Sequence, residues 1–289
     1  MKYSRNGECW CGSKKKYKQC HYDFDLKIID FKMKGCITPS KEIIKNKKEI
    51  ELIKESAKIN TMVLDEVARY IKVGMSTAEI DKIVYDFTIS RQAIPAPLNY
   101  DGYPYSVCTS INDEVCHGMP SESRLIQEGD IINVDVSTIY KGYFSDASRM
   151  FMMGKVSVEA EKLVEVTQKS LDAGLAAIKP WGFLGDVSEA VMNVARANGY
   201  SVVTKFGGHG VGKAFHEEPF VSHVGFAGTG MILAPGMIFT IEPMLNEGSN
   251  DVVIDKDNGW TVTTLDHKLS AQWENMVLIT EHGYEILSK

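Results

Sequence analysis

The sequence predicts an α/β (α+β) domain of about 250 residues behind a small N-terminal appendage. Helical and strand patterns alternate in two roughly similar halves, and apolar residues make up 44% of the 289 positions. No short repeat or low-complexity tract interrupts this order. A chain of this length buries roughly 75% of its unfolded surface, so a large core is available without disulfide bonds. The length is compatible with two domains or with one large α/β unit.

Composition excludes several classes of protein. The 32 Lys and Arg residues against 38 Asp and Glu residues give a formal charge of −6. The apolar content excludes a disordered chain, and no apolar run approaches the roughly 18 residues of a membrane span. The first ten residues, MKYSRNGECW, lack the apolar core of a signal peptide. We therefore expect a soluble, cytoplasmic protein.

Two helices are expected at the start of the domain. After the break at residues 38–40, apolar side chains between 43 and 71 recur at three-, four- and seven-residue steps, which indicates one long amphipathic helix. Gly74 is expected at its C′ position. Residues 76–79, Ser-Thr-Ala-Glu, are typical of a capping box that begins a second helix.

A hairpin and further alternating elements follow. Residues 106–110 and 131–136 are rich in strand-forming residues, and Tyr140 to Tyr143 indicate a hairpin with Lys141-Gly142 as its two-residue turn. The other expected elements are helices at about 157–178 and 186–198, and strands at about 201–205, 237–243, 260–265 and 271–280.

Two aspartates are expected on one face of this hairpin. With Lys141-Gly142 as the turn, Asp146 pairs with Ser137, and Asp135 becomes its diagonal neighbour. Asp135 lies among apolar neighbours, where an unpaired anion would be costly. Taken alone, such an aspartate is also compatible with a structural, hydrogen-bonded role.

A second group of residues strengthens the metal interpretation. His209 lies in the glycine-rich segment FGGHGVGKAFHEEP, and Glu242 and Glu274 each interrupt an apolar strand pattern. Together with Asp135 and Asp146, these carboxylates would repel one another unless cations lay between them. Two divalent ions about 3.5–4 Å apart neutralise such a set, polarise a carbonyl and activate water. Carboxylates with one imidazole suit Mn, Fe or Co better than an all-thiolate zinc site.

Two further histidines are candidates for the site. His216 follows His209 by seven residues, and His117 precedes a glycine in NDEVCHGMP. Alone, His117 is compatible with a loop histidine whose ring is satisfied by the backbone. Beside a hydrolytic metal pair it becomes a candidate for contacting the scissile peptide.

Five segments, taken in order, resemble the type I methionine aminopeptidases: NDEVCHGMP, NVDVSTIYKGYFSDASRMF, FGGHGVGKAFHEEP, TIEPM and SAQWENMVLIT. The resemblance extends from about residue 40 to the C-terminus. It implies the pita-bread fold, in which two pseudo-symmetric halves enclose a dinuclear metal centre. It also implies a hydrolase, usually monomeric, that removes the initiator methionine from new proteins when the second residue is small.

The resemblance assigns the metal ligands to Asp135, Asp146, His209, Glu242 and Glu274. Asp146 and Glu274 would bridge the two ions, which could be Co, Mn, Fe or Zn. Asp135 would complete the shell of one ion, and His209 and Glu242 that of the other.

The resemblance also assigns catalytic and substrate-binding roles. His216 would support the carbonyl oxygen of the scissile bond, and His117 would contact the scissile nitrogen. Glu242 or Glu274 would relay a proton, and the identity of the general acid stays open. The methionine pocket would be formed by Tyr100, Tyr103, Cys108, Phe215 and Trp260. Pro97 and Asn99 depart from many bacterial relatives at the pocket edge.

The N-terminal 38 residues are polar, poor in periodic apolar pattern and rich in metal-ligand types. Cys9, Cys11, Cys20 and His21 form a set of three thiols and one imidazole that suits structural zinc. The stretch CWCGSKKKYKQCH resembles the SEC-C motif, which implies one zinc ion that clips an otherwise unfolded segment. We therefore predict a zinc-binding extension over residues 1–38 and a catalytic domain over 39–289.

The same end of the chain is basic. Residues 1–48 hold 13 Lys and Arg against 5 Asp and Glu, a balance of +8. This charge indicates either a solvated tail or an arm that contacts RNA or an acidic partner, such as the ribosome or a secretion factor.

Two other functions remain as alternatives. One is a proline-directed aminopeptidase of the same fold, such as a prolidase or aminopeptidase P. The other is a non-catalytic binding module, which would be expected to lose metal ligands, although this sequence retains all five.

Overall fold

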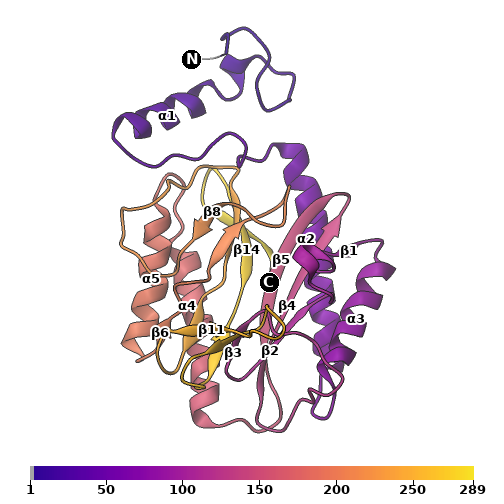
Figure 1. The fold of residues 1–289 in the computed structure, drawn as a ribbon. Helices are drawn as coiled ribbons and strands as arrows, with labels where there is room; N and C mark the ends of the chain where they lie inside the picture. Colours follow the sequence, from indigo (N-terminus) through magenta and orange to yellow (C-terminus); the bar gives the residue numbers. More distant parts are fainter. Residues whose placement is uncertain (1–2) are drawn as a thin grey trace.

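The computed structural model describes residues 3–289, so the first two residues of the predicted N-terminal extension lie outside it. It contains an α/β body and a separate N-terminal segment that lies at one end of this body (Figure 1). That segment holds a short 3-10 helix, η1 (Tyr17–Gln19), and helix α1 (Tyr22–Met33). No helix among residues 3–289 combines the length and the apolarity needed to cross a membrane.

The first half of the body is a four-stranded antiparallel sheet covered by two helices. Its centre is the hairpin of β4 and β5, and β1 and β2 pair with successive parts of the other edge of β4. Apolar side chains of α2, α3 and β4, including Leu64, Val84 and Val134, form one buried cluster. The elements are α2 (Lys47–Tyr70), α3 (Thr77–Ser90), β1 (Ile94–Pro95), η2 (Tyr100–Gly102), β2 (Cys108–Ile111), β4 (Ile131–Tyr140) and β5 (Tyr143–Met152).

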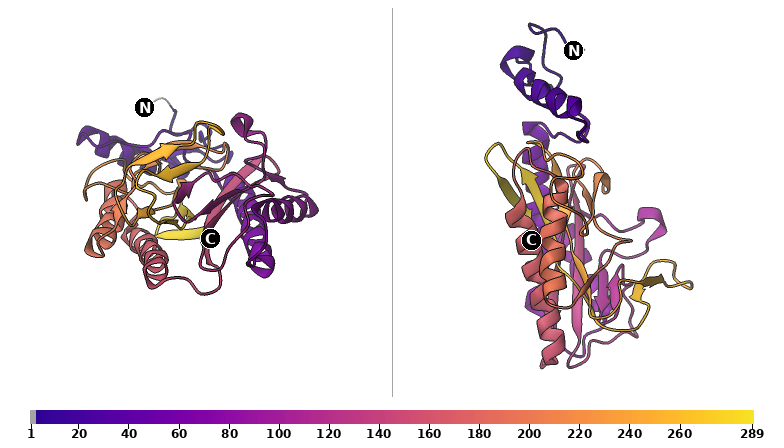
Figure 2. Two further views of the ribbon diagram at one scale, coloured as in Figure 1. Left: turned by 60° about the horizontal axis from the view of Figure 1, so that its bottom comes forward. Right: turned by 90° about the vertical axis from the view of Figure 1, so that its left-hand side faces the viewer.

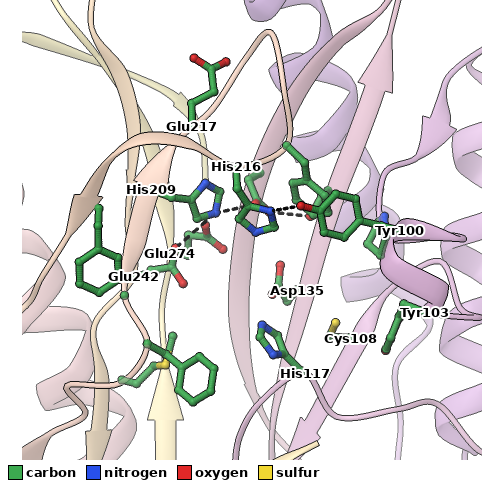
Figure 3. Close-up of a pocket in the computed structure, with 18 of the residues that line it drawn as sticks. Tyr100, Tyr103, Cys108, His117, Asp135, His209, His216, Glu217, Glu242 and Glu274 are labelled. Atoms are coloured by element: carbon green, nitrogen blue, oxygen red, sulfur yellow. Dashed lines mark hydrogen bonds and ion pairs between the residues drawn. The ribbon is translucent and has the colours of Figure 1, made fainter. Parts of the chain in front are cut away.

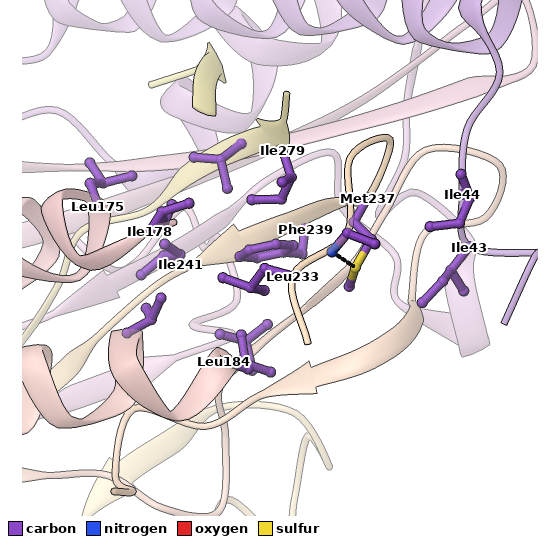
Figure 4. Close-up of a cluster of buried hydrophobic side chains, with 14 of the residues drawn as sticks. Ile43, Ile44, Leu175, Ile178, Leu184, Leu233, Met237, Phe239, Ile241 and Ile279 are labelled. Carbon is purple, nitrogen blue, oxygen red and sulfur yellow. Dashed lines mark hydrogen bonds between the residues drawn. The ribbon is translucent and has the colours of Figure 1, made fainter. Parts of the chain in front are cut away.

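The second half is a five-stranded sheet with its own helix pair. Its strand order is β15-β14-β9-β7-β8. Leu175 of α4, Leu184 of α5, Phe239 of β9 and Ile279 of β14 belong to one buried cluster (Figure 4). The elements are α4 (Val158–Ala177), α5 (Leu184–Ala197), β7 (Gly208–Gly210), β8 (Glu217–Val221), β9 (Ile238–Ile241), β14 (Asn275–Ile279) and β15 (Tyr284–Ser288).

Two three-stranded sheets complete the body. One has the order β13-β10-β6 and the other the order β11-β12-β3. Both helix pairs lie on the outer side of the strands, one pair on each half (Figure 2). The remaining strands are β3 (Glu114–Cys116), β6 (Ser201–Val202), β10 (Met244–Asn246), β11 (Val252–Ile254), β12 (Val262–Thr264) and β13 (Ser270–Gln272).

The two halves meet where β5 passes the start of β14. An isolated antiparallel bridge pairs Ser148 with Glu274, and the Glu274 N–H donates to the Ser148 carbonyl at 3.2 Å. Asp146 lies two residues before Ser148 on the same strand. The carboxylates of Asp146 and Glu274, which are 128 positions apart in the sequence, are thereby brought together where the two halves meet.

The N-terminal segment contacts the body through Trp181, in the turn before α5. The ring centroid of Phe24 lies 5.2 Å from that of Trp181, and Phe31 stacks on the same indole at 6.1 Å. The Lys27 ammonium lies 4.3 Å from the indole centroid. Trp181 has a left-handed φ of 67°, and its N–H donates to the Leu233 carbonyl at 2.7 Å.

The local predictions of the hairpin and the capping box are confirmed. Tyr140 pairs with Tyr143, and both turn residues have positive φ, 51° for Lys141 and 81° for Gly142. The Ser76 hydroxyl accepts from the Glu79 N–H at 3.2 Å, and the Ser76 N–H donates to the Glu79 carboxylate at 2.7 Å.

The predicted limits of the first long helix are wrong at both ends. Helix α2 begins at Lys47, because Asn46 caps it, and the apolar residues Ile43 and Ile44 pack into the core of the second half instead. The helix ends at Tyr70, so Gly74 is not its C′ residue. Gly74 lies in a later turn with φ 85°, and its N–H donates to the Ile126 carbonyl.

Three other elements differ from expectation. The N-terminal segment contains helix α1, which its sequence pattern did not predict, because its apolar residues largely alternate with polar ones and do not follow the spacing of one helix face. Their partner Trp181 is also remote in sequence. The expected strand at 271–280 is broken at residues 273–274, where Glu274 bridges to β5. The expected strand at 201–205 ends at Val202.

Candidate metal centre and active-site pocket

A pocket of about 630 Å³ lies between the two halves of the body. Side chains of both sheets line it, and they surround a group of carboxylates and imidazoles (Figure 3). All twelve body residues predicted for the site line this one pocket: Tyr100, Tyr103, Cys108, His117, Asp135, Asp146, His209, Phe215, His216, Glu242, Trp260 and Glu274.

The five predicted metal ligands come from five separate segments. Asp135 is on β4 and Asp146 on β5, His209 is on β7, Glu242 directly follows β9, and Glu274 lies between β13 and β14. The His209 Nε2 atom is 3.5 Å from an Asp146 oxygen and 3.8 Å from a Glu242 oxygen. Ligand atoms of Asp146, His209 and Glu274 all lie within 4.8 Å of one another.

Hydrogen bonds from residues that the sequence did not indicate orient Glu242. The Thr240 hydroxyl donates to Glu242 Oε1 at 2.7 Å and accepts from the His209 N–H at 3.0 Å. The Gln272 amide donates to Glu242 Oε2 at 3.1 Å. The Glu242 N–H donates to the buried His223 ring at 3.0 Å, and burial lowers the pKa of His223 to about 3, so this ring is a neutral acceptor.

Glycine is required beside His209 because neighbouring backbone is close. A Cβ at Gly208 would lie 2.2 Å from the Thr240 carbonyl oxygen, and a Cβ at Gly210 would lie 2.1 Å from the Glu218 carbonyl oxygen. Only a residue without a side chain lets β7 approach both neighbouring strands this closely. Gly208 and Gly210 therefore let β7 hold His209 in its position between the neighbouring strands.

Burial of several carboxylates together disfavours their charged forms. Burial, followed by repulsion from the neighbouring carboxylates, raises the pKa of Asp135 and of Glu274 well above the ordinary range. Burial likewise raises the pKa of Glu242 to about 7, although His209 opposes this shift. Burial alone would lower the pKa of His209, but Asp146 and Glu242 raise it to about 9.

The donor set fits divalent cations. Within residues 3–289, the buried Oδ1 atom of Asp135 has no hydrogen-bond partner. His209 lies 3.5 Å from an Asp146 oxygen and 3.8 Å from a Glu242 oxygen, and this single imidazole leaves the set of Asp135, Asp146, Glu242 and Glu274 with an excess of carboxylates. Oxygen ligands with one imidazole suit hard or borderline divalent metals.

The two other histidines are neutral imidazoles near neutral pH. Burial lowers the pKa of His117, whose ring lies 5.6 Å from the Phe206 ring. Burial, then the proximity of His209, lowers the pKa of His216 to about 4. His216 Nδ1 is 2.9 Å from the Tyr100 hydroxyl oxygen, and its ring centroid is 4.3 Å from that of His209.

The predicted methionine-pocket residues form two groups. Tyr103 and Trp260 lie in edge contact at 5.1 Å, and the buried Cys108 thiol is beside Tyr103. Tyr100 and Phe215 lie in edge contact at 4.9 Å beside His216 instead. The first group forms an apolar slot next to the carboxylates, and the second forms an aromatic wall behind His216.

Phe206 and Met244 also line the pocket, and the sequence prediction missed them. Phe206 directly precedes the glycine-rich turn and Met244 ends the TIEPM segment. Adjacency to these motifs was the signal that could have identified them.

The N-terminal segment gathers the second predicted set of ligands. The Cys9 and Cys20 sulfurs each lie 3.2 Å from His21 Nδ1, and the Cys11 and Cys20 sulfurs are 3.6 Å apart. All four ligand atoms lie within 4.8 Å of one another, and the cysteines form no disulfide. Three thiols and one imidazole at these separations fit a closed tetrahedral zinc site.

Comparison with known proteins identifies a family match for the body and one for the N-terminal segment. The model of metallopeptidase family M24 matches residues 51–281, and that of the SEC-C motif matches residues 5–23. The chain is 47% identical to methionine aminopeptidase A of Synechocystis over 84% of its length and 96% of that protein. It is 42% identical to the methionine aminopeptidase of Chlamydia muridarum over 98% of both chains.

A solved structure shares the fold. The methionine aminopeptidase from Rickettsia prowazekii superimposes with a TM-score of 0.83 at 39% identity, over 85% of this chain and 99% of that one. The pita-bread fold predicted from the sequence is therefore confirmed.

The carboxylate set generates a prediction about metal binding. Replacing Glu274 by Gln should weaken divalent-metal affinity by at least about a hundredfold, because a direct ligand loses its negative charge and one of its two oxygens, and changes to outer-shell partners alone cost about 10- to 100-fold. Titration calorimetry with Mn²⁺ on chelator-treated protein measures this change. The exposed Glu281→Gln is the matched control, and equal affinity in both variants would exclude Glu274 as a ligand.

The thiol cluster generates a second prediction. Cys20→Ser should remove about one equivalent of tightly held zinc per chain, since an open tetrahedral set binds zinc far more weakly. Elemental analysis after dialysis measures the loss. Cys36→Ser removes a cysteine outside the cluster and should retain the zinc; an unchanged zinc content in Cys20→Ser would refute the assignment.

Proposed function

The chain belongs to metallopeptidase family M24, and we propose how its pocket carries out the reaction of the methionine aminopeptidases that it resembles. The protein removes the N-terminal methionine of new polypeptides when the second residue is small. One observation supports this proposal most strongly. A single pocket is lined both by the cluster of carboxylates and imidazoles and by the apolar side chains of the predicted methionine slot.

Divalent metal ions are held by Asp135, Asp146, His209, Glu242 and Glu274 in this proposal. Ligand atoms of Asp146, His209 and Glu274 lie within 4.8 Å of one another, so these three residues would hold a cation together. When bound, the metals polarise the scissile carbonyl and lower the pKa of water. Mn, Fe, Co or Zn fits the donor set, and their availability in the cell decides among them.

The methionine side chain enters the slot formed by Tyr103, Cys108 and Trp260, with Phe206 and Met244 completing its walls. A thioether is apolar and polarizable, and it makes favourable contacts with aromatic ring edges. The edge contact of Tyr103 and Trp260 supports a slot with fixed walls.

Two neutral histidines handle the peptide bond. His216, fixed by the Tyr100 hydroxyl, donates a hydrogen bond to the carbonyl oxygen as negative charge develops there. His117 contacts the scissile nitrogen from the opposite wall. Glu242 or Glu274 accepts the proton that the attacking water loses, and the departing amine must receive one in turn.

Release of methionine from Met-Ala-Ser tests the proposal. Chelated protein reloaded with Mn²⁺ or Co²⁺ should release methionine, and chelation should abolish the release. A peptide with proline in the second position and a residue other than methionine in the first is assayed in parallel. Cleavage of that peptide alone would assign the chain to the proline-directed aminopeptidases, and cleavage of neither with metal bound would indicate a binding role.

The role of His117 generates a prediction. His117→Ala should lower kcat about a hundredfold or more, because a proton-transfer or hydrogen-bonding group is lost at the reacting bond. Both metal ions should stay bound, as elemental analysis can verify. His267→Ala, at an exposed histidine paired with Asp113, is the control. Loss of metal from His117→Ala would contradict a role in substrate contact alone.

The N-terminal extension, residues 1–38, is in this proposal a zinc-stabilised module that directs the enzyme to ribosomes. Lys14, Lys15, Lys16 and Lys18 are all exposed on the zinc-binding segment. Their charge fits the phosphate backbone of ribosomal RNA. Such docking would place the enzyme where new N-termini emerge.

Charge reversal tests this docking. Replacing Lys14, Lys15, Lys16 and Lys18 by glutamate should reduce salt-sensitive co-sedimentation with ribosomes at least about tenfold. Hydrolysis of Met-Ala-Ser should stay unchanged. The same reversal at the exposed lysines Lys72, Lys82, Lys162 and Lys169 is the control. Equal co-sedimentation of the two variants would refute docking through this segment.

A further inference from the structure

The loop that carries His216 is closed by the side chain of Glu217. Glu217 Oε1 accepts from the N–H groups of Lys213 at 2.6 Å and Ala214 at 3.0 Å. The Glu217 side chain points away from the carboxylate cluster, although its neighbour His216 faces that cluster (Figure 3). Glu217, the first residue of β8, therefore closes the loop that precedes it and does not belong to the predicted metal-ligand set.

The other oxygen of Glu217 binds a buried lysine from a remote segment. Lys45 Nζ donates to Glu217 Oε2 at 2.5 Å, across 172 positions of sequence. The side chain of Lys45 is 0% exposed, and that of Glu217 is 11% exposed. Burial lowers the pKa of Lys45, and Glu217 opposes this shift.

Two glycines of the body, Gly212 and Gly236, leave space for Lys45 and its backbone. A Cβ at Gly212 would lie 3.3 Å from the Lys45 side chain and 2.6 Å from Ile53. A Cβ at Gly236 would lie 3.2 Å from the Lys45 carbonyl oxygen, and the Lys45 N–H donates to the Gly236 carbonyl at 2.9 Å. Larger residues at these two glycines would obstruct the segment that delivers the lysine.

That segment is anchored on both sides of Lys45. Ile43 and Ile44 pack into the core beside Met237 and Phe239 (Figure 4), and Asn46 caps α2. The Lys213 ammonium donates to the Glu42 carbonyl, which ties the loop to the same segment a second time. The His216 loop is thus tied to a segment that is itself packed into the core.

We propose that Lys45 is a positioning residue for His216, which it holds in place through its ion pair with Glu217. The inference rests on the proposed role of His216 at the scissile carbonyl. A buried ion pair adds little net stability, because desolvation offsets the attraction. It does fix geometry, and a displacement of about 1 Å at a catalytic group can cost about a hundredfold in rate.

Two variants separate positioning from stability. Lys45→Met leaves a buried, unpaired Glu217, so both the melting temperature and kcat for Met-Ala-Ser should fall. Lys45→Met/Glu217→Gln has no unpaired charge, and the introduced glutamine keeps an oxygen for the loop N–H groups. Its melting temperature should recover toward that of the unmodified protein, whereas kcat should stay at least about tenfold low with little change in KM. Recovery of kcat along with the melting temperature would overturn the proposal.

A double-mutant cycle of Lys45→Met and His216→Ala tests whether Lys45 acts through His216. Lys45→Met should lower kcat strongly in the unmodified protein but less than about twofold in a His216→Ala background, since the group that it positions is absent there. An equal loss in both backgrounds would refute the coupling. Amide hydrogen exchange of residues 213–218 should also quicken in Lys45→Met, and unchanged exchange would count against a held loop.

Lys54→Met is the matched control, because it breaks the partly exposed ion pair of Lys54 with Glu285. It should alter neither kcat nor exchange in the His216 loop. If the unmodified protein released no methionine, the proposed function would fail. If it were active and Lys45→Met kept full kcat, only the positioning role would fail.

Discussion

The burial of four carboxylates in one pocket is the constraint on which the rest of the structure depends. Each of Asp135, Asp146, Glu242 and Glu274 comes from a different strand or strand end, so neither half of the body could assemble the group alone. The bridge from Ser148 to Glu274 brings the two halves into register at this point. Hydrogen bonds from Thr240 and Gln272 then fix the orientation of the Glu242 carboxylate, which repulsion from the neighbouring carboxylates would otherwise disturb.

Much of the fold and the set of buried carboxylates could be predicted from local sequence, whereas the residues of the methionine pocket were named only through the family resemblance. The register of the β4–β5 hairpin followed from its two-residue turn, and that register put Asp135 and Asp146 on one face. Carboxylates that interrupt apolar strands are conspicuous because their burial is costly without a counter-charge. The cysteine and histidine cluster was identified by its ligand types, three thiols and one imidazole within 13 residues, and the structure brings their ligand atoms together.

Contacts between segments that are remote in sequence could not be predicted in this way. Helix α1 packs its apolar side chains on Trp181, about 150 positions later, so its own pattern carried too little signal. The late start of the first long helix had a similar cause, since Ile43 and Ile44 belong to a core that only the second half supplies. Lys45 is one of many lysines in a basic stretch, and its burial depends on Glu217 and two distant glycines.

The placement of residues 42–46 has a consequence for how N-terminal modules can be gained or lost. These residues precede α2 and continue its apolar pattern, yet Ile43 and Ile44 pack into the core of the second half and Lys45 holds the His216 loop. A recombination event or an engineered fusion that joins a new module directly to α2 would remove them along with the old module. The junction that preserves the enzyme lies earlier, before Glu42, which makes the zinc-binding segment exchangeable as a unit while its last connecting residues remain part of the enzyme.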